Sequence, residues 1–242
     1  SDCVDLSIKY AERASEQFGL PVYLYAKSAR SDSRVRLPDI RRGQYEGLAE
    51  KIVDPEWKPD YGPAEFKSSM GATATGARNI LIAYNVNLDT DDKSSANRIA
   101  GKLRSSGVLK KDENGEKIIG EDGKPERIPG RFQSLQAAGW MYNDDIAQVS
   151  MNLLDYSTTG LHSVTEAIRT EAAEMGIKVT AGELVGLVPL DAIVDAGRHY
   201  NKDDSVTDAR ILVDLAITKL QLDVLDDFNP DERIIEWAAK VI

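Results

Sequence analysis

The sequence has little of the residue types that form disulfides, metal sites and many catalytic centres. It contains one cysteine, Cys3, and two histidines, His162 and His199, among 242 residues. A single cysteine excludes an internal disulfide and a cysteine-based metal site. No apolar stretch approaches the ~20 residues that a membrane-spanning helix needs. We therefore expect a cytoplasmic protein.

Positive charge is also scarce relative to negative charge. The chain has 30 lysines and arginines against 40 aspartates and glutamates, for a net charge of −10. Nucleic-acid binding needs a concentrated basic face, so this balance disfavours it, and anionic membranes are disfavoured for the same reason. A hydrophobic content of 42% and a charged content of 29% are ordinary for a globular protein. The length suits one large domain or two small ones.

The front of the chain predicts a partial α/β unit. Apolar residues at helical spacing predict helices over 2–18 and 38–52, and β-forming residues predict a strand over 22–25. Gly43 and Gly47 weaken the second helix. One strand and two helices are too few to close a core, so we expect the rest of this unit upstream.

From residue 79 the periodicity predicts a complete second unit. Its expected elements are strand 79–88, helix 92–106, strands 132–142 and 146–155, helix 159–175 and strand 177–187. This order is the split βαβ plan of ferredoxin-like domains, in which both helices cover one sheet face and the first and third strands pair centrally. Three helices are expected to follow, and residues 107–130 are predicted to be a surface excursion with turns at Asn114-Gly115 and Asp122-Gly123.

A glycine- and serine-rich segment leads from Asp60 into the first strand of this unit. Gly62, Gly71 and Gly76 permit a positive φ, so we expect irregular structure up to the strand. A loop rich in exposed amides and anchored on a buried strand is typical of ligand clamps. An ordinary domain linker has the same composition, and composition alone leaves both interpretations open.

This segment and others resemble the formiminotransferase domain of glutamate formimidoyltransferase. The matching pieces are LPVYLY, IRRGQYEGLAEKI, DPEWKPDYGP, GATATGARNILIAYNVNL, AQVSMNLLDY and ELVGLVPLDAI. The resemblance extends nearly from end to end. It implies a partial N-terminal subdomain with the folate loop over 1–76 and a C-terminal subdomain over 77–242. It also implies that the family domain begins before Ser1.

The resemblance implies that the loop contacts folate, with tetrahydrofolate in a tunnel between the two subdomains. The implied folate-binding residues are Gly62, Pro63, Ala64, Glu65, Phe66, Lys67, Ser68, Ser69, Met70 and Gly71. Serine hydroxyls can bind polar ring edges, Phe66 can stack on a ring, and Lys67 can pair with a carboxylate of the glutamyl tail. Arg41, Arg42, Lys51 and Lys58 are interpreted as solvated charges and left out of the site.

Amide side chains on the two central strands form a second candidate site. Asn85 and Asn87 on one strand are expected to neighbour Gln148 and Asn152 on the other, on the side away from the helices. Amides both donate and accept, so they suit a pteridine or an amidine. Alternatively, these amides are simply solvated on an uncovered sheet face.

No residue of the chain is assigned as catalytic. Transfer of a formimino group requires proton movement, for which a histidine is suited. His162 and His199, however, lie at helix ends, where packing or capping is the simpler interpretation. The resemblance implies that the family's catalytic histidine lies upstream of Ser1, and the acidic group Asp89, Asp91 and Asp92 is attributed to helix capping rather than a metal.

The resemblance implies an enzyme that transfers the formimino group from N-formimino-L-glutamate to tetrahydrofolate in histidine degradation. The expected ligands are these small molecules, without a metal. A homodimer, or a chain that supplies the missing N-terminal portion, is the expected protein partner. The alternative is a folate-binding or interaction module that has lost the catalytic segment.

Overall fold

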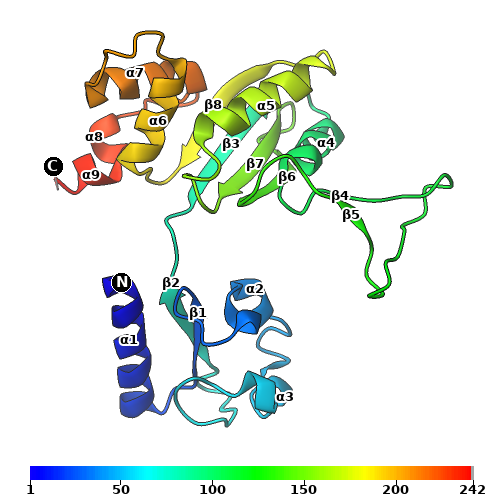
Figure 1. Cartoon of the computed structure of the whole chain (residues 1–242), viewed down its shortest axis with the longest axis vertical. Helices are drawn as coiled ribbons and strands as arrows, with labels where there is room; N and C mark the ends of the chain where they lie inside the picture. Colours follow the sequence, from blue (N-terminus) through cyan, green and yellow to red (C-terminus); the bar gives the residue numbers. More distant parts are fainter. Residues whose placement is uncertain (241–242) are drawn as a thin grey trace. The chain divides into compact units, whose positions relative to one another are not determined.

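The computed structural model describes residues 1–240. The chain divides into two compact units, Ser1–Asn79 and Ile80–Ile242. Both units combine helices with strands, as the predicted α/β class requires (Figure 1). Among the described residues, no helix is long and apolar enough to cross a bilayer.

The first unit is built on one long helix and a pair of parallel strands. Its elements are α1 (Asp2–Phe18), β1 (Val22–Ala26), η1 (Asp32–Arg34), α2 (Leu37–Ile40), α3 (Leu48–Lys51), η2 (Pro55–Trp57) and β2 (Thr73–Ala77). Helix α1 ends at Gly19, whose φ of +63° lets its N–H bond the carbonyl of Ser15. The buried side chains of Ala11, Ala14, Val22 and Leu24 form the small core between α1 and the strands.

Two predictions for this unit are wrong. Residues 38–52 form two short helices instead of one, because the backbone has a positive φ at Gly43 (+85°) and Gln44 (+53°), which an α-helix cannot contain. The glycine-rich segment is also not irregular throughout, since Thr73–Ala77 pairs with Val22–Ala26 in parallel. Gly76 lies within this strand and has no positive φ.

The second unit has the predicted split βαβ plan. Its four-stranded sheet has the order β6-β7-β3-β8, with β3 (Ile82–Leu88) antiparallel to both β7 (Ala147–Leu153) and β8 (Val179–Val185). Strand β6 (Leu135–Met141) pairs with the outer side of β7. The first and third strands of the plan, β3 and β7, therefore pair at the centre, as predicted.

Helices α4 (Lys93–Leu103) and α5 (Leu161–Ala173) pack on one face of this sheet. Ile82, Tyr84, Val86 and Leu88 of β3 are fully buried in the same core as α4 and α5. Ile80 lies within the predicted strand 79–88, but it precedes the observed strand and is half exposed. Because side chains alternate along a strand, Asn85 and Asn87 point to the other face.

Two small strands and four further helices complete the described part of the second unit. They are the small strands β4 (Val108–Leu109) and β5 (Arg127–Ile128) and the helices α6 (Leu190–Tyr200), α7 (Ala209–Leu220), α8 (Pro230–Arg233) and α9 (Ile235–Ala238). The β4–β5 excursion projects from the unit as predicted (Figure 1), with left-handed glycines at Gly115 and Gly123. Asp208 caps α7, because its carboxylate accepts from the backbone N–H groups of Arg210 and Ile211.

Candidate functional site

The loop Gly62–Gly71 begins at a buried ion pair. The Arg34 Nη1 atom lies 2.8 Å from Asp60 Oδ2, and both side chains are at least nine-tenths buried. The same carboxylate oxygen accepts from the backbone N–H of Leu24 in β1, and Arg34 also donates to the carbonyls of Glu56 and Lys58. The start of the loop is thus fixed to β1 and to the segment before it.

The loop itself is irregular, as predicted. Gly62 has a φ of +84°, and a Cβ there would lie 2.4 Å from the carbonyl oxygen of Leu20, so no larger residue fits. The loop closes with a turn in which the Lys67 carbonyl accepts from the N–H groups of Met70 and Gly71, at 3.0 and 2.9 Å. Gly71, with a φ of +64°, then leads into β2.

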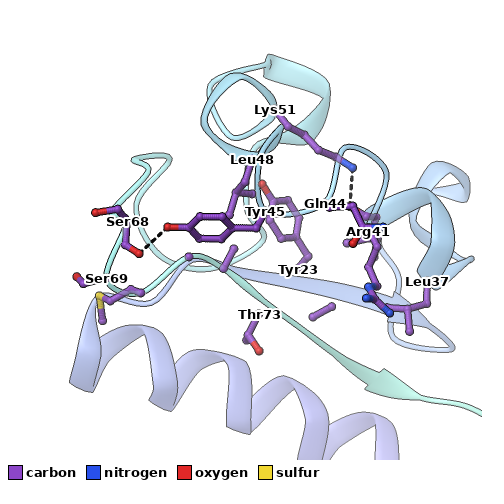
Figure 2. Close-up of a pocket in the computed structure, with 15 residues that line it drawn as sticks. Tyr23, Leu37, Arg41, Gln44, Tyr45, Leu48, Lys51, Ser68, Ser69 and Thr73 are labelled. Carbon is purple, nitrogen blue, oxygen red and sulfur yellow. Dashed lines mark hydrogen bonds between the residues drawn. The ribbon is translucent and has the colours of Figure 1, made fainter.

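The end of this loop borders a cavity of about 610 Å³, which we call the loop pocket (Figure 2). Its lining residues are Tyr23, Leu37, Ile40, Arg41, Gln44, Tyr45, Leu48, Lys51, Ser68, Ser69, Met70, Gly71, Ala72, Thr73 and Ala74. The lining therefore combines aliphatic and aromatic surface with serine and threonine hydroxyls and two cations. This is the usual composition of a small-molecule site.

Tyr45 ties the loop to the segment between α2 and α3. Its hydroxyl donates to the Ser68 carbonyl at 2.6 Å, and its ring meets Phe66 edge-on with centroids 5.6 Å apart. In Figure 2, Ser68 and Ser69 lie on one side of Tyr45, and Arg41 lies on the other. Tyr45 lies in the matching piece IRRGQYEGLAEKI, but its hydrogen bond to a backbone carbonyl cannot be predicted from residue types.

Two cations line the pocket and differ in their contacts. Lys51 Nζ donates to the carbonyls of Asp39, Ile40 and Arg42 at 2.9, 2.5 and 3.2 Å, and it lies 3.9 Å from the Trp57 ring centroid. Burial, with the nearby Arg42 guanidinium, lowers the pKa of Lys51 from its usual value. Arg41 is exposed, and within residues 1–240 no carboxylate lies at ion-pair distance from its guanidinium.

The structure divides the ten predicted loop residues into two groups. Ser68, Ser69, Met70 and Gly71 line the loop pocket, whereas Gly62, Pro63, Ala64, Glu65, Phe66 and Lys67 do not. Arg41 and Lys51, which the sequence interpretation left out, do line it. Their signal was the resemblance of the piece IRRGQYEGLAEKI, which contains both.

The amide residues of the second unit form a hydrogen-bonded cluster. Gln148 Nε2 donates to Asn87 Oδ1 at 2.8 Å and to Glu183 Oε2 at 2.9 Å, and Asn85 Nδ2 donates to the same glutamate oxygen at 2.8 Å. Asn87 and Gln148 are 1% and 3% exposed. We call Asn85, Asn87, Gln148 and Glu183 the amide cluster.

Asn152 lies on the same sheet face but outside this cluster. It is opposite Ala83 in the β3–β7 register, two positions along β3 from Asn85. Glu183 was missed, although the predicted strand 177–187 contains it. Once β8 pairs with β3, the register places Glu183 opposite Asn85, so the missing information was strand pairing rather than residue type.

Comparison with known proteins identifies the family. Residues 1–78 match the N-terminal subdomain of the formiminotransferase domain, and residues 83–240 match the formiminotransferase domain. The chain belongs to the formiminotransferase family. This confirms the resemblance drawn from the sequence pieces.

Named relatives support the same assignment. Over 239 residues the chain is 42% identical to the mouse formimidoyltransferase-cyclodeaminase, an alignment that covers 98% of this chain and 41% of that protein. It is 36% identical over 200 residues to a glutamate formimidoyltransferase of Streptococcus pyogenes, an alignment that covers 82% of this chain and 60% of that protein. With the glutamate formimidoyltransferase of Thermoplasma acidophilum the identity is 34% over 241 residues, which are 99% of this chain and 66% of that protein. This formiminotransferase chain thus spans less than half the length of its mouse relative.

The two histidines of this formiminotransferase chain pack against each other. Their rings stack with centroids 4.3 Å apart and an interplanar angle of 19°, with His162 on α5 and His199 on α6. His162 Nδ1 lies 3.6 Å from Asp195 Oδ2. Burial, followed by the neighbouring His199, lowers the pKa of His162. The stack joins two helices, and it fits the packing role expected from the sequence.

The acidic group at the start of α4 also has a structural role. Asp92 accepts from the backbone N–H groups of Ser94 and Ser95 and from both of their hydroxyls. The hydroxyl bonds from Ser94 and then Ser95 lower the pKa of Asp92 to about 2. Its carboxylate is therefore a helix cap, as expected.

Proposed function

We propose that this formiminotransferase chain acts as a glutamate formimidoyltransferase, transferring the formimino group of N-formimino-L-glutamate to tetrahydrofolate. Family membership across both units supports the reaction class. The printed names of the bacterial and archaeal relatives support glutamate as the group that carries the formimino unit. Histidine degradation is the pathway in which we place this reaction.

The loop pocket is the observation that carries the proposal. Its aliphatic and aromatic residues suit an aromatic ring, Ser68 and Ser69 supply hydroxyls, and Arg41 supplies a cation that no carboxylate of residues 1–240 neutralises. Folate combines a flat heteroaromatic ring with an anionic glutamyl tail. We therefore assign the tail carboxylate to Arg41, in place of the Lys67 assignment made from the sequence.

The reaction is an attack by the N5 amine of tetrahydrofolate on the amidine carbon. A bond forms between N5 and that carbon, and the bond from the carbon to the glutamate nitrogen breaks. One proton leaves N5, and one reaches the departing glutamate nitrogen. Holding both substrates in a reactive geometry lowers the entropic part of the barrier. We assign positioning, and not proton transfer, to the residues of the loop pocket and the amide cluster.

A turnover assay tests the proposal. The chain is incubated with N-formimino-L-glutamate and tetrahydrofolate, and both released glutamate and formimino-tetrahydrofolate are quantified by mass spectrometry. Replacing Ser68 and Ser69 together by alanine removes two hydroxyls and should raise KM for tetrahydrofolate by about tenfold. Ser106→Ala, on an exposed turn of the second unit, is the matched control and should leave KM unchanged.

Binding of folate without turnover supports the alternative, a folate-binding module. A protein that shows neither folate binding nor turnover would contradict both functions. The cytoplasmic location, the independence from metal and the homodimer or partner chain remain predictions, each of which needs its own measurement.

A further inference from the structure

Glu183 is a carboxylate held in place without a cation. Its Oε2 atom accepts from Asn85 and Gln148, but within residues 1–240 no lysine, arginine or histidine lies at ion-pair distance from it. Its Oε1 atom accepts no hydrogen bond from these residues, and it is absent from their buried unsatisfied atoms, so it remains in contact with solvent. The carboxylate thus has one fixed oxygen and one available oxygen.

A buried donor in the same cluster also has no acceptor. Asn87 is 1% exposed and its Oδ1 accepts from Gln148, but its Nδ2 group has no partner among residues 1–240. Buried amide donors in folded proteins are almost always satisfied. A donor left open beside an oriented carboxylate is typical of a site completed by a ligand.

There is space for a ligand beside Glu183. A cavity of about 440 Å³ is lined by Glu183, Val185 and Tyr142, by the segment that follows α7, including Asp226 and Asp227, and by Arg233 of α8. Tyr142 is 44% exposed, so its ring is available to a planar group.

We propose that Glu183 is a specificity-determining residue that binds an N–C–N edge with an N–H on each nitrogen. Such an edge pairs with a carboxylate through two parallel charge-assisted hydrogen bonds. This assignment rests on the proposed function, whose two substrates both carry the edge. In tetrahydrofolate it is N3–H with the 2-amino group, and in N-formimino-L-glutamate it is the formamidine group.

The paired hydrogen bonds explain why a carboxylate, rather than another amide, occupies position 183. A formamidine or an aminopyrimidinone donates stronger hydrogen bonds to a carboxylate than to a neutral amide, because the carboxylate is ionised. Asn85 and Gln148 then act as positioning residues that fix the plane of the Glu183 carboxylate. An oxygen analogue such as N-formyl-L-glutamate lacks one of the two donors.

Calorimetric titration of the 242-residue chain with each substrate tests the assignment. Glu183→Gln keeps the shape and an acceptor for both amides but removes the charge. We expect it to weaken binding of one of the two substrates by about 10- to 100-fold. The affected substrate identifies the source of the edge. Glu183→Asp shortens the side chain but retains the charge, so it should bind that substrate more tightly than Glu183→Gln does.

Glu121→Gln, on the exposed hairpin, removes one negative charge elsewhere and should change neither affinity. Far-UV circular dichroism and thermal midpoints establish that the variants are folded. Unchanged binding of both substrates by Glu183→Gln, or an equal loss for both, overturns the assignment and leaves the proposed function standing. Wild-type protein that binds neither substrate overturns both.

Discussion

Arg41 and Lys51 both line the loop pocket, but their side chains contact different groups. The Lys51 ammonium donates to three backbone carbonyls of residues 39–42, and it lies over the ring of Trp57. Arg41 is exposed at the end of α2. We therefore expect Lys51 to stabilise the pocket wall and Arg41 to meet a ligand.

Replacement of each cation by methionine separates these two roles. Lys51→Met removes the ammonium donor from the three carbonyls and should lower the free energy of unfolding by about 1–3 kcal/mol. Arg41→Met should change it by less than about 0.5 kcal/mol, as is usual at exposed positions. Thermal and urea unfolding measure both. Equal losses from the two variants would contradict the distinction.

The stacked histidines make stability depend on pH. The folded pKa of His162 is lowered from 6.5, first by burial and then by the proximity of His199, while Asp195 and Glu166 act in the opposite direction. The unfolded chain therefore binds more protons than the folded chain in this range. The contribution of His162 to stability is fully present above about pH 6.5 and is lost as the pH falls through the lower folded pKa.

Comparison with His162→Gln isolates this contribution. Between about pH 7.5 and about pH 5 the thermal midpoint of the wild type should fall more steeply than that of the variant. Carboxylates that titrate at lower pH affect both proteins equally, so the difference reports on His162. Parallel curves would contradict the assignment.

At the scale of elements, β2 depends on the absence of a side chain at Gly76. A Cβ at this position would lie 2.2 Å from the carbonyl oxygen of Tyr25 in the paired strand β1. The close approach is to backbone, which cannot move aside without breaking the β1–β2 pairing. Gly76→Ala should lower the free energy of unfolding of the first unit by about 1–3 kcal/mol.

Gly120→Ala is the matched control for this prediction. Gly120 lies in the exposed hairpin, and the nearest atom to an added Cβ is the Asp122 carboxylate at 3.3 Å. Thermal unfolding should show a clear loss for Gly76→Ala and little change for the control. Similar midpoints for the two variants would mean that β2 tolerates a side chain.

The sequence predicted the second unit better than the first. The row Ile82, Tyr84, Val86 and Leu88 alternates cleanly, and all four side chains are fully buried, so strand period and burial agree. In the first unit, β2 reads TATGA, which lacks large apolar residues. Its strand conformation comes from pairing with β1, which local composition does not contain.

The candidate sites were predictable only in part from the sequence. The resemblance located the loop, and alternation placed Asn85 and Asn87 on one face. Glu183 and Arg41 were missed, because their significance depends on strand register and on a cavity, neither of which is encoded by spacing along the chain.

At the scale of the whole molecule, both units match one family, over residues 1–78 and 83–240. The chain nevertheless carries a net charge of −10, which repels anionic substrates at long range. An anionic folate tail therefore requires local cations. Within the loop pocket, Arg41 is the cation that does not donate to neighbouring carbonyls, as Lys51 does.

Titration of tetrahydrofolate into the wild type, Arg41→Met and Arg13→Met tests this account most directly. Arg13 is exposed on α1 and serves as the matched control for charge. The account predicts that Arg41→Met weakens folate binding by about tenfold or more, whereas Arg13→Met binds as the wild type does. Failure of the wild type to bind folate, or equal affinities for all three proteins, would contradict it.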